Sequence, residues 1–136
     1  CLNLNSKELD AIDISPEMLN IARTKNCYSK IIEADLSKEL SINDNHYGAI
    51  VSAGTFTHGH VGPNVLDELI RVTRPDGLFV FTVHSKLFKK AGFDKKLLEI
   101  KKSITEPIFH EVDAYGNNPD KDHGSDQVII TVFRKR

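Results

Sequence analysis

The chain has 136 residues, of which 40% are hydrophobic and 27% are charged, a composition typical of one ordinary globular domain and not of a disordered or fibrous chain. Its formal net charge of -1 gives no broad attraction to nucleic acid or to an anionic membrane. No apolar stretch approaches the roughly 20 residues that cross a bilayer, and no secretory signal is present. We therefore expect a single cytoplasmic domain over residues 1–136, with no nucleic-acid or membrane partner.

The sequence gives little support for disulfide or metal chemistry. Cys1 and Cys27 are the two cysteines, and without an export signal we expect both thiols to be reduced. The one run that suggests metal binding is His58-Gly59-His60. Because zinc needs about four ligands at close spacing, we expect no metal site.

The first part of the chain predicts a strand, a helix and a second strand. Residues 9–14 form a short, mostly apolar run that is typical of a buried strand. A strong helix start follows, because Ser15 can cap the free amide groups and Pro16 stands where no amide hydrogen is needed. Residues 30–35 predict the second strand.

The middle of the chain continues this alternation. Residues 47–53 predict a third strand that is apolar on both faces and therefore central. Residues 54–62 are rich in Gly, Thr and His and predict a loop, after which Pro63 opens an amphipathic helix. Residues 74–77 predict a tight turn into a fourth apolar strand at residues 78–83.

The last third of the chain ends differently. A helix is predicted around residues 93–102, and two strands, at residues 108–115 and 127–134, follow without a helix between them. That arrangement favours an antiparallel hairpin at the edge of a mostly parallel sheet, so the whole pattern predicts a three-layer α/β domain. The lysines near the helix are expected on its wet face: Lys86, Lys89, Lys90, Lys95, Lys96, Lys101 and Lys102.

Candidate ligand-binding residues follow the ends of the predicted strands, where open parallel sheets bind ligands. Asp13 can accept hydrogen bonds from two ribose hydroxyls; it can also cap a helix, but Ser15 already fills that position. Asp35 can accept a hydrogen bond from an adenine amino group or cap a turn through Ser37, and both interpretations stay open. Gly54 permits close approach of a ligand to the backbone, although a single glycine after a strand is common turn chemistry.

Three histidines are predicted at the same rim of the sheet. His58 and His60 lie in the loop after the third strand, and His84 follows the fourth strand. A neutral imidazole can accept a proton from a nucleophilic substrate near physiological pH. The alternative is that these are loop histidines that hydrogen-bond to backbone or water.

The pattern resembles class I S-adenosylmethionine-dependent methyltransferases, which implies a Rossmann-like fold and S-adenosylmethionine as cofactor. Residues 10–22 resemble the second-strand motif of that family, residues 33–36 the third-strand motif, residues 47–58 the fourth strand with its active-site loop, and residues 69–81 the turn into the fifth strand. By this resemblance Asp13 binds the ribose, Ile14 and Met18 flank the adenine or ribose, and Asp35 and Leu36 contact the adenine. We also expect Ala53 and Gly54 to contact the cofactor.

The loop at residues 54–63 is similar to that of the methyltransferase-like proteins of the Williams–Beuren region. From their place at the rim of the predicted sheet, we expect His58 nearest the transferred methyl group, with His60 and His84 toward a small-molecule acceptor. The resemblance does not identify that acceptor.

Two departures from the family pattern stand out. Gly48 replaces an acid that is usual at that point of the strand. More importantly, the glycine-rich cofactor loop would lie about 20 residues before the ribose-binding acid, which falls ahead of Cys1. We expect the natural protein to have further residues there, including a first strand between those that end near Asp13 and Ser52. If the chain folds without them, those two strands pair directly or another chain fills the gap.

The leading hypothesis is methyl transfer from S-adenosylmethionine, accelerated mainly by proximity and orientation, with any general base secondary. The alternative is a non-catalytic methyltransferase fragment that forms a homodimer and binds the cofactor weakly or not at all. A nicotinamide-binding Rossmann domain also uses an acid in the position of Asp13, but the turn at residues 74–77 and the closing strand pair argue against it.

Overall fold

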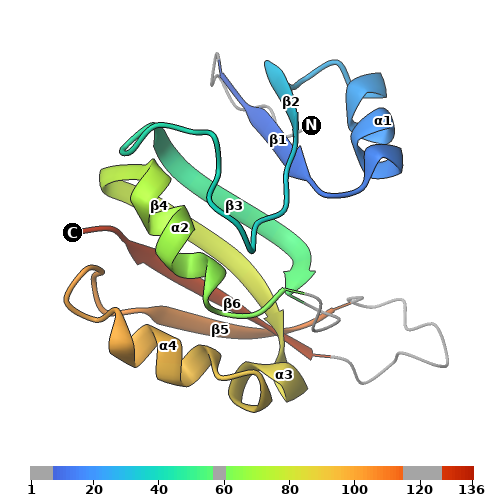
Figure 1. Cartoon of the computed structure of the whole chain (residues 1–136). Helices are drawn as coiled ribbons and strands as arrows, with labels where there is room; N and C mark the ends of the chain where they lie inside the picture. The colour runs from blue at the N-terminus through green and yellow to red at the C-terminus, as the bar shows by residue number, and fades with distance from the viewer. Residues whose placement is uncertain (1–7, 57–60, 115–126) are drawn as a thin grey trace, which may run out of the picture. The chain divides into compact units, whose positions relative to one another are not determined.

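The computed structural model describes residues 8–56, 61–114 and 127–136. The chain divides into two compact units, residues 1–40 and residues 41–136, which are considered separately below (Figure 1). The expectation of one domain over residues 1–136 stays a prediction. In the described part of the chain, no helix is long and apolar enough to span a membrane.

The first unit is a parallel strand pair joined by one helix. Strand β1 (Asp10–Asp13), helix α1 (Pro16–Thr24) and strand β2 (Lys30–Glu33) follow the predicted order. The predicted helix start is confirmed, because the Ser15 hydroxyl accepts a hydrogen bond from the Met18 N–H at 3.2 Å and Pro16 is the first helical residue. In the strand pair Asp13 lies opposite Glu33, so both strands end at the same edge.

The second unit is a mixed four-stranded sheet with three helices. Its elements are β3 (Tyr47–Phe56), α2 (Val65–Val72), β4 (Thr73–His84), α3 (Ser85–Lys90), α4 (Phe93–Glu99), β5 (Ile108–Asp113) and β6 (Gln127–Arg134). The strand order is β3-β4-β6-β5, in which β3 and β4 are parallel and the other two pairings are antiparallel. The predicted C-terminal antiparallel pair is therefore confirmed, and the fold is an α/β arrangement with a mixed sheet.

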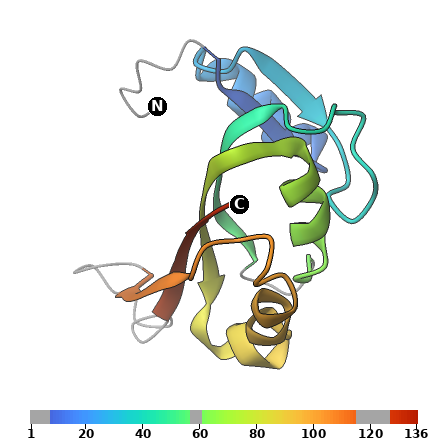
Figure 2. The same cartoon turned by 90° about the vertical axis from the view of Figure 1, so that its left-hand side faces the viewer.

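The three helices of the second unit pack on the same side of its sheet (Figure 2). Alternate residues of β4, such as Phe79 and Phe81, point to that side and are fully buried, because successive side chains of a strand face opposite ways. Phe81 and Phe56 both contact the ring of Phe93 from α4. The core of this unit is thus an aromatic layer between sheet and helices.

The opposite face of the sheet carries the residues that alternate with this core. Their exposure is partial to high; Val51, for example, is 68% exposed. We call this surface the open face and define it by the apolar residues that cross-strand pairing places on it: Ala49, Val51, Leu78, Val80, Ile108, Val112, Val128, Ile130 and Val132.

The predicted turn at residues 74–77 is built into strand β4 as a bulge. Tyr47 pairs with Thr73, but the next pair is Ala49 with Leu78, so the residues between Thr73 and Leu78 oppose Gly48 alone. Asp76 has a positive φ of 63°, and a Cβ added to Gly77 would stand 2.3 Å from the Thr73 methyl carbon. The turn chemistry was predicted correctly, whereas its incorporation into a longer strand was not.

Other element boundaries also differ from the predictions. Strand β3 extends to Phe56, so residues 54–56, predicted as loop, belong to the sheet. Helix α3 was not predicted, because its six residues are too few to display a helical repeat. Helix α4 ends at Glu99, three residues earlier than residue 102. Helix α3 begins at Ser85, directly after His84 at the end of β4.

The strands form two separate sheets in the described part of the chain. Strand β1 pairs with β2, while β3 is the edge of the four-stranded sheet. The pairing of β1 with β3, one of the two outcomes expected for a sheet without its first strand, stays a prediction.

Two predictions about single side chains are wrong. Lys96 was expected on the wet face of its helix but is 5% exposed, and its ammonium group bonds Asp67 Oδ2 at 2.6 Å and Glu99 Oε1 at 3.2 Å. The spacing explains this result, because Lys96 lies three residues after Phe93 and four before Ile100, both of which are buried. Cys27 was expected to be reduced but is disulfide-bonded.

Candidate functional site

Asp13 ends strand β1, directly before the capped start of α1. Its carboxylate oxygen Oδ1 accepts a hydrogen bond from the Ser15 N–H at 2.9 Å, which fixes the side chain at the junction of strand and helix. The Ala34 N–H donates to the Asp13 backbone carbonyl at 3.0 Å, so the junction is also tied to the end of β2. Since one carboxylate has about four acceptor positions, Asp13 retains the chemistry needed to bind a vicinal diol.

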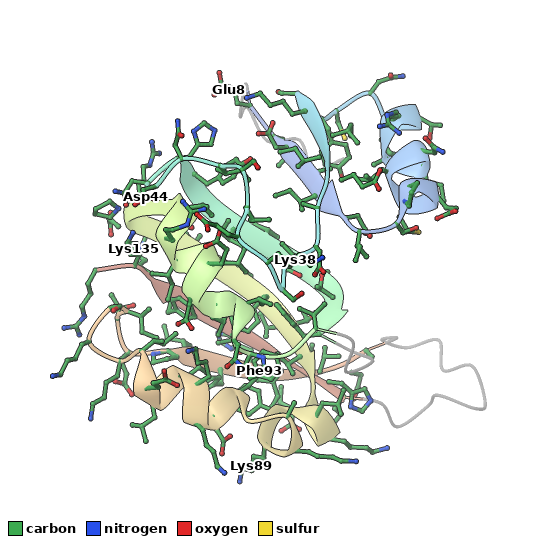
Figure 3. All side chains as sticks on the ribbon, viewed as in Figure 1. Glu8, Lys38, Asp44, Lys89, Phe93 and Lys135 are labelled. Carbon is green, nitrogen blue, oxygen red and sulfur yellow. The ribbon has the colours of Figure 1, made fainter. Side chains whose placement is uncertain are left out.

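Asp35 lies two residues beyond the end of β2, at the same edge of the strand pair as Asp13. Its Oδ1 accepts hydrogen bonds from the Ser37 hydroxyl at 2.6 Å and from the Ser37 N–H at 2.9 Å. Its Oδ2 lies 3.7 Å from the ammonium group of Lys38, which Figure 3 labels. The turn through Ser37, one of the two interpretations left open, is therefore present.

These contacts also set the ionisation of Asp35. The hydrogen bond from the Ser37 hydroxyl, followed by that from the Ser37 N–H, lowers the pKa of the Asp35 carboxyl below its ordinary value of 3.8. The carboxylate is consequently ionised at neutral pH and acts as an acceptor only. Its two oxygens are engaged unequally, because both Ser37 donors bond Oδ1, whereas the contact given for Oδ2 within the described residues is the long ion pair with Lys38.

Apolar side chains stand next to the two acids in the first unit. Ile14, which follows Asp13, is 63% exposed, and Met18 in the first turns of α1 is 52% exposed. Leu36, which follows Asp35, is half-buried. Exposed apolar residues beside fixed carboxylates suit a ligand that has an aromatic ring and hydroxyl groups.

The predicted site residues of the second unit lie at the carboxyl ends of β3 and β4. Ala53 and Gly54 are exposed, and Gly54 has a positive φ of 90°, a backbone conformation that favours glycine. The Gly54 N–H donates to the hydroxyl of Thr82 on β4 at 3.2 Å. Thr82 therefore holds the end of β3, a role that the sequence does not reveal because it depends on strand register.

His84 is the last residue of β4 and the N-cap of α3. Its Nδ1 accepts a hydrogen bond from the Lys86 N–H at 3.2 Å, so the ring caps the helix in addition to any contact with a substrate. His58 and His60, the other two predicted histidines, lie outside the described residues. Within the described ranges, no group of three His, Cys, Asp or Glu is placed to hold a metal ion.

The cofactor of the resembled family can be tested against the described residues of the first unit. Adenosine presents two ribose hydroxyls, an amino group and a flat ring. The unit offers the Asp13 carboxylate, the Asp35 carboxylate and exposed apolar side chains at one strand edge. The residues present fit this part of S-adenosylmethionine.

Comparison with known structures reveals the same fold in several methyltransferases. The N-methyltransferase NodS from Bradyrhizobium japonicum aligns over 95% of this chain and 74% of its own, with 16% identity and a TM-score of 0.63. A Listeria monocytogenes protein assigned as an S-adenosylmethionine-dependent methyltransferase aligns over 96% and 81%, with 11% identity and a TM-score of 0.70. An S-adenosylmethionine-dependent methyltransferase from Mesorhizobium loti aligns over 95% of this chain and 81% of its own, with 12% identity and a TM-score of 0.65. At these identities the similarity establishes the fold.

The family follows from the sequence match. None of the curated proteins matches the chain. The model of the methyltransferase domain family, however, matches residues 1–81, which is more than half of the chain and includes β1, α1, β2, β3 and most of β4. The chain therefore belongs to the family of S-adenosylmethionine-dependent methyltransferase domains.

Proposed function

We propose that this domain binds S-adenosylmethionine through Asp13 and Asp35 and transfers its methyl group to a small-molecule acceptor. The observation that carries the proposal is the parallel pairing of β1 and β2, which brings both carboxylates to one edge of the first unit beside exposed Ile14 and Met18. In this proposal Asp13 accepts from the ribose hydroxyls and Asp35 accepts from the adenine amino group through Oδ2. The apolar side chains of Ile14, Met18 and Leu36 cover the ring.

The cofactor supplies the electrophilic methyl group on its sulfonium, and the protein positions the acceptor relative to that group. Methyl transfer needs an acceptor atom in line with the methyl carbon, so orientation contributes most of the acceleration. We assign Ala53 and Gly54 to the cofactor, since exposed small residues permit close approach to the backbone. His58 is proposed nearest the transferred methyl group, with His60 and His84 toward the acceptor. The similarity of residues 54–63 to the Williams–Beuren-region subgroup supports the placement of these histidines and no other part of the proposal.

A titration with S-adenosylhomocysteine in a calorimeter tests cofactor binding without knowledge of the acceptor. The wild-type chain is expected to bind, and Asp13→Ala is expected to weaken binding by about 100-fold or more, because hydrogen bonds to a charged group contribute roughly 1.5–3 kcal/mol each. Glu39→Ala is the matched control, since Glu39 is an exposed acid of the same unit. Equal weakening by both variants would contradict a specific role for Asp13.

The second candidate function is a non-catalytic methyltransferase fragment that forms a homodimer. One observation favours it: the Asp35 carboxylate already accepts a hydrogen bond from the Ser37 hydroxyl. The same titration separates the candidates. Absence of heat from a folded wild-type chain supports the fragment, whereas saturable binding that Asp13→Ala removes supports the methyltransferase.

A further inference from the structure

Strand β3 is irregular near its carboxyl end, where it lies beside β4 (Figure 1). The pairing of the two strands shifts between Ser52 and Phe56, so that residues 53–55 of β3 lie opposite Thr82 alone. The extra residues make a bulge, which bends the strand and interrupts its regular hydrogen bonding. Bulges re-aim the chain and are over-represented beside active sites, so the contacts that hold this one are of interest.

Two hydrogen bonds that involve hydroxyl groups fix the conformation of the bulge. The Gly54 N–H donates to the Thr82 hydroxyl at 3.2 Å, and the Ser52 hydroxyl donates to the Thr55 hydroxyl at 2.7 Å. Gly54, which lies between Ser52 and Thr55, has a φ of 90°, a conformation that other residues rarely adopt. Side chains from two strands therefore hold a stretch of backbone that does not have regular strand geometry.

The hydrogen bond from Gly54 to Thr82 does more than satisfy a donor. Gly54 is exposed, so water would accept from its N–H in the absence of the Thr82 hydroxyl. Thr82 itself is fixed by regular antiparallel pairing with Ile130 of β6. Because a strand inside a sheet is a more rigid support than a loop, the bond determines where the Gly54 backbone lies.

We propose that Thr82 is a positioning residue for the cofactor, whose hydroxyl holds Ala53 and Gly54 in the conformation that contacts S-adenosylmethionine. The proposal rests on the proposed function, which assigns Ala53 and Gly54 to the cofactor. Thr82 acts through the Gly54 backbone and not on the reacting atoms. Such an indirect effect is measurable, since a displacement of about 1 Å at a binding site can lower activity by about 100-fold.

Thr82→Val tests this role, because valine keeps the β-branched shape and removes the acceptor. In a calorimetric titration with S-adenosylhomocysteine, Thr82→Val is expected to bind about threefold to tenfold more weakly than wild type, the effect of one neutral hydrogen bond. Thr82→Ser keeps the hydroxyl and should bind within about twofold of wild type. Rescue by serine distinguishes positioning by the hydroxyl from a general change in packing.

Thr131→Val is the matched control on the neighbouring strand β6. Thr131 is fully buried, and its hydroxyl has no hydrogen-bond partner among the described residues. The same substitution therefore removes no hydrogen bond there, and the affinity for S-adenosylhomocysteine should stay within about twofold of wild type. Weakening equal to that of Thr82→Val overturns the proposal, since the loss would follow from the exchange of threonine for valine alone.

Hydrogen exchange of the Gly54 amide measures the bond without any cofactor. Thr82→Val should accelerate exchange of the Gly54 N–H by about tenfold or more, whereas Thr82→Ser should leave it close to wild type. Unchanged exchange in Thr82→Val overturns the proposal. Faster exchange with unchanged affinity for S-adenosylhomocysteine also overturns it, because the bond would then hold the bulge without serving the cofactor.

Failure of the proposed function gives a different result. A folded wild-type chain that binds no S-adenosylhomocysteine contradicts the proposed function and this inference with it, whereas equal binding by wild type and Thr82→Val contradicts the inference alone. Circular dichroism checks that each variant is folded. If Thr82→Val does not fold, Ser52→Ala replaces it, since it removes the other hydrogen bond of the bulge, and unchanged affinity in that variant is equally contradictory.

Discussion

Lys96 illustrates how a charged residue can belong to the interior of a helix pair. Burial of its ammonium group acts to lower the pKa, but the hydrogen bonds and charges of Asp67 and Glu99 outweigh burial and raise the pKa above its ordinary value of 10.5. The Asp67 bond connects α4 to α2, two helices that cover the same face of the sheet (Figure 3 labels Phe93, which begins α4). The lysine therefore stabilises the helix layer as well as its own helix.

Removal of the Asp67 carboxylate and removal of the Lys96 ammonium group should change the free energy of unfolding by different amounts. Asp67→Ala leaves a buried ammonium group with Glu99 alone and is expected to lower the free energy of unfolding by about 1–2 kcal/mol, a modest value because both acids are exposed. Lys96→Met keeps the aliphatic stem and is expected to stay within about 1 kcal/mol of wild type at pH 7. Urea unfolding of the two variants checks this order, and a larger loss for Lys96→Met contradicts it.

The pH dependence of the same pair has a defined sign. Because the pKa of Lys96 is raised in the folded state, its contribution to stability is fully present below the unfolded value near 10.5 and is lost as the pH rises through the folded value. The difference in unfolding free energy between wild type and Lys96→Met should therefore be constant from pH 7 to about pH 10 and move against the wild type above that range. A difference that changes between pH 5 and 8 instead would point to another group.

At the scale of elements, periodicity and capping predicted which helices and strands form better than they predicted where these elements begin and end. Ser15 and Pro16 identify the start of α1 because capping is a local interaction, and the two apolar runs near Asp13 and Asp35 identify β1 and β2. Strand register could not be predicted from the sequence. The bulge at residues 74–77 and the hydrogen bond from Gly54 to Thr82 were therefore missed. Both depend on residues far apart in sequence.

The candidate site was likewise predicted in part and missed in part. The position of Asp13 and Asp35 at one edge follows from parallel strands of equal length, which the sequence indicates through two short apolar runs before acids. The engagement of Asp35 by Ser37 was one of two open interpretations, because a turn and a ligand need the same carboxylate. The burial of Lys96 was missed because a lysine at a core position of a helix is rare, although its spacing from Phe93 and Ile100 signals it.

The bulge in β4 depends on the absence of a side chain at Gly77. A Cβ at Gly77 would lie 2.3 Å from Thr73 Cγ2 and 2.8 Å from the Arg74 carbonyl oxygen, and that backbone atom cannot rotate away. Gly77→Ala is expected to lower the free energy of unfolding by roughly 2–4 kcal/mol, whereas Gly62→Ala, which meets nothing within 4 Å, should change it by less than about 0.5 kcal/mol. Chemical denaturation of both variants compares them. Similar losses of unfolding free energy for the two variants would mean that the backbone of the bulge can shift to accommodate a Cβ.

At the scale of the whole chain, the apolar core is distributed very unequally between the two units. All seven phenylalanines of the sequence lie in residues 41–136, and six of them are buried there. Phe88 is 8% exposed, and the other five are each 2% exposed or less: Phe56, Phe79, Phe81, Phe93 and Phe133. In the described part of the first unit the buried hydrophobic residues are Leu19 and Leu40. A small unit with so few buried side chains gains little free energy against the entropy of ordering its backbone.

This imbalance predicts which part of the chain folds by itself. Residues 41–136 contain the four-stranded sheet and its three helices. They also contain the hydrogen bonds by which the Lys135 ammonium group connects the C-terminal segment to Asn45 before β3, to Ile70 of α2 and to Thr73 at the start of β4. Expressed alone, they should give dispersed amide resonances and a cooperative urea transition, whereas residues 1–40 alone should give neither. A residue 41–136 fragment without cooperative unfolding would mean that the first unit contributes to the stability of the sheet. The same fragment lacks Asp13 and Asp35, so it should fold and yet fail to bind S-adenosylhomocysteine, which separates the stability of the domain from recognition of its cofactor.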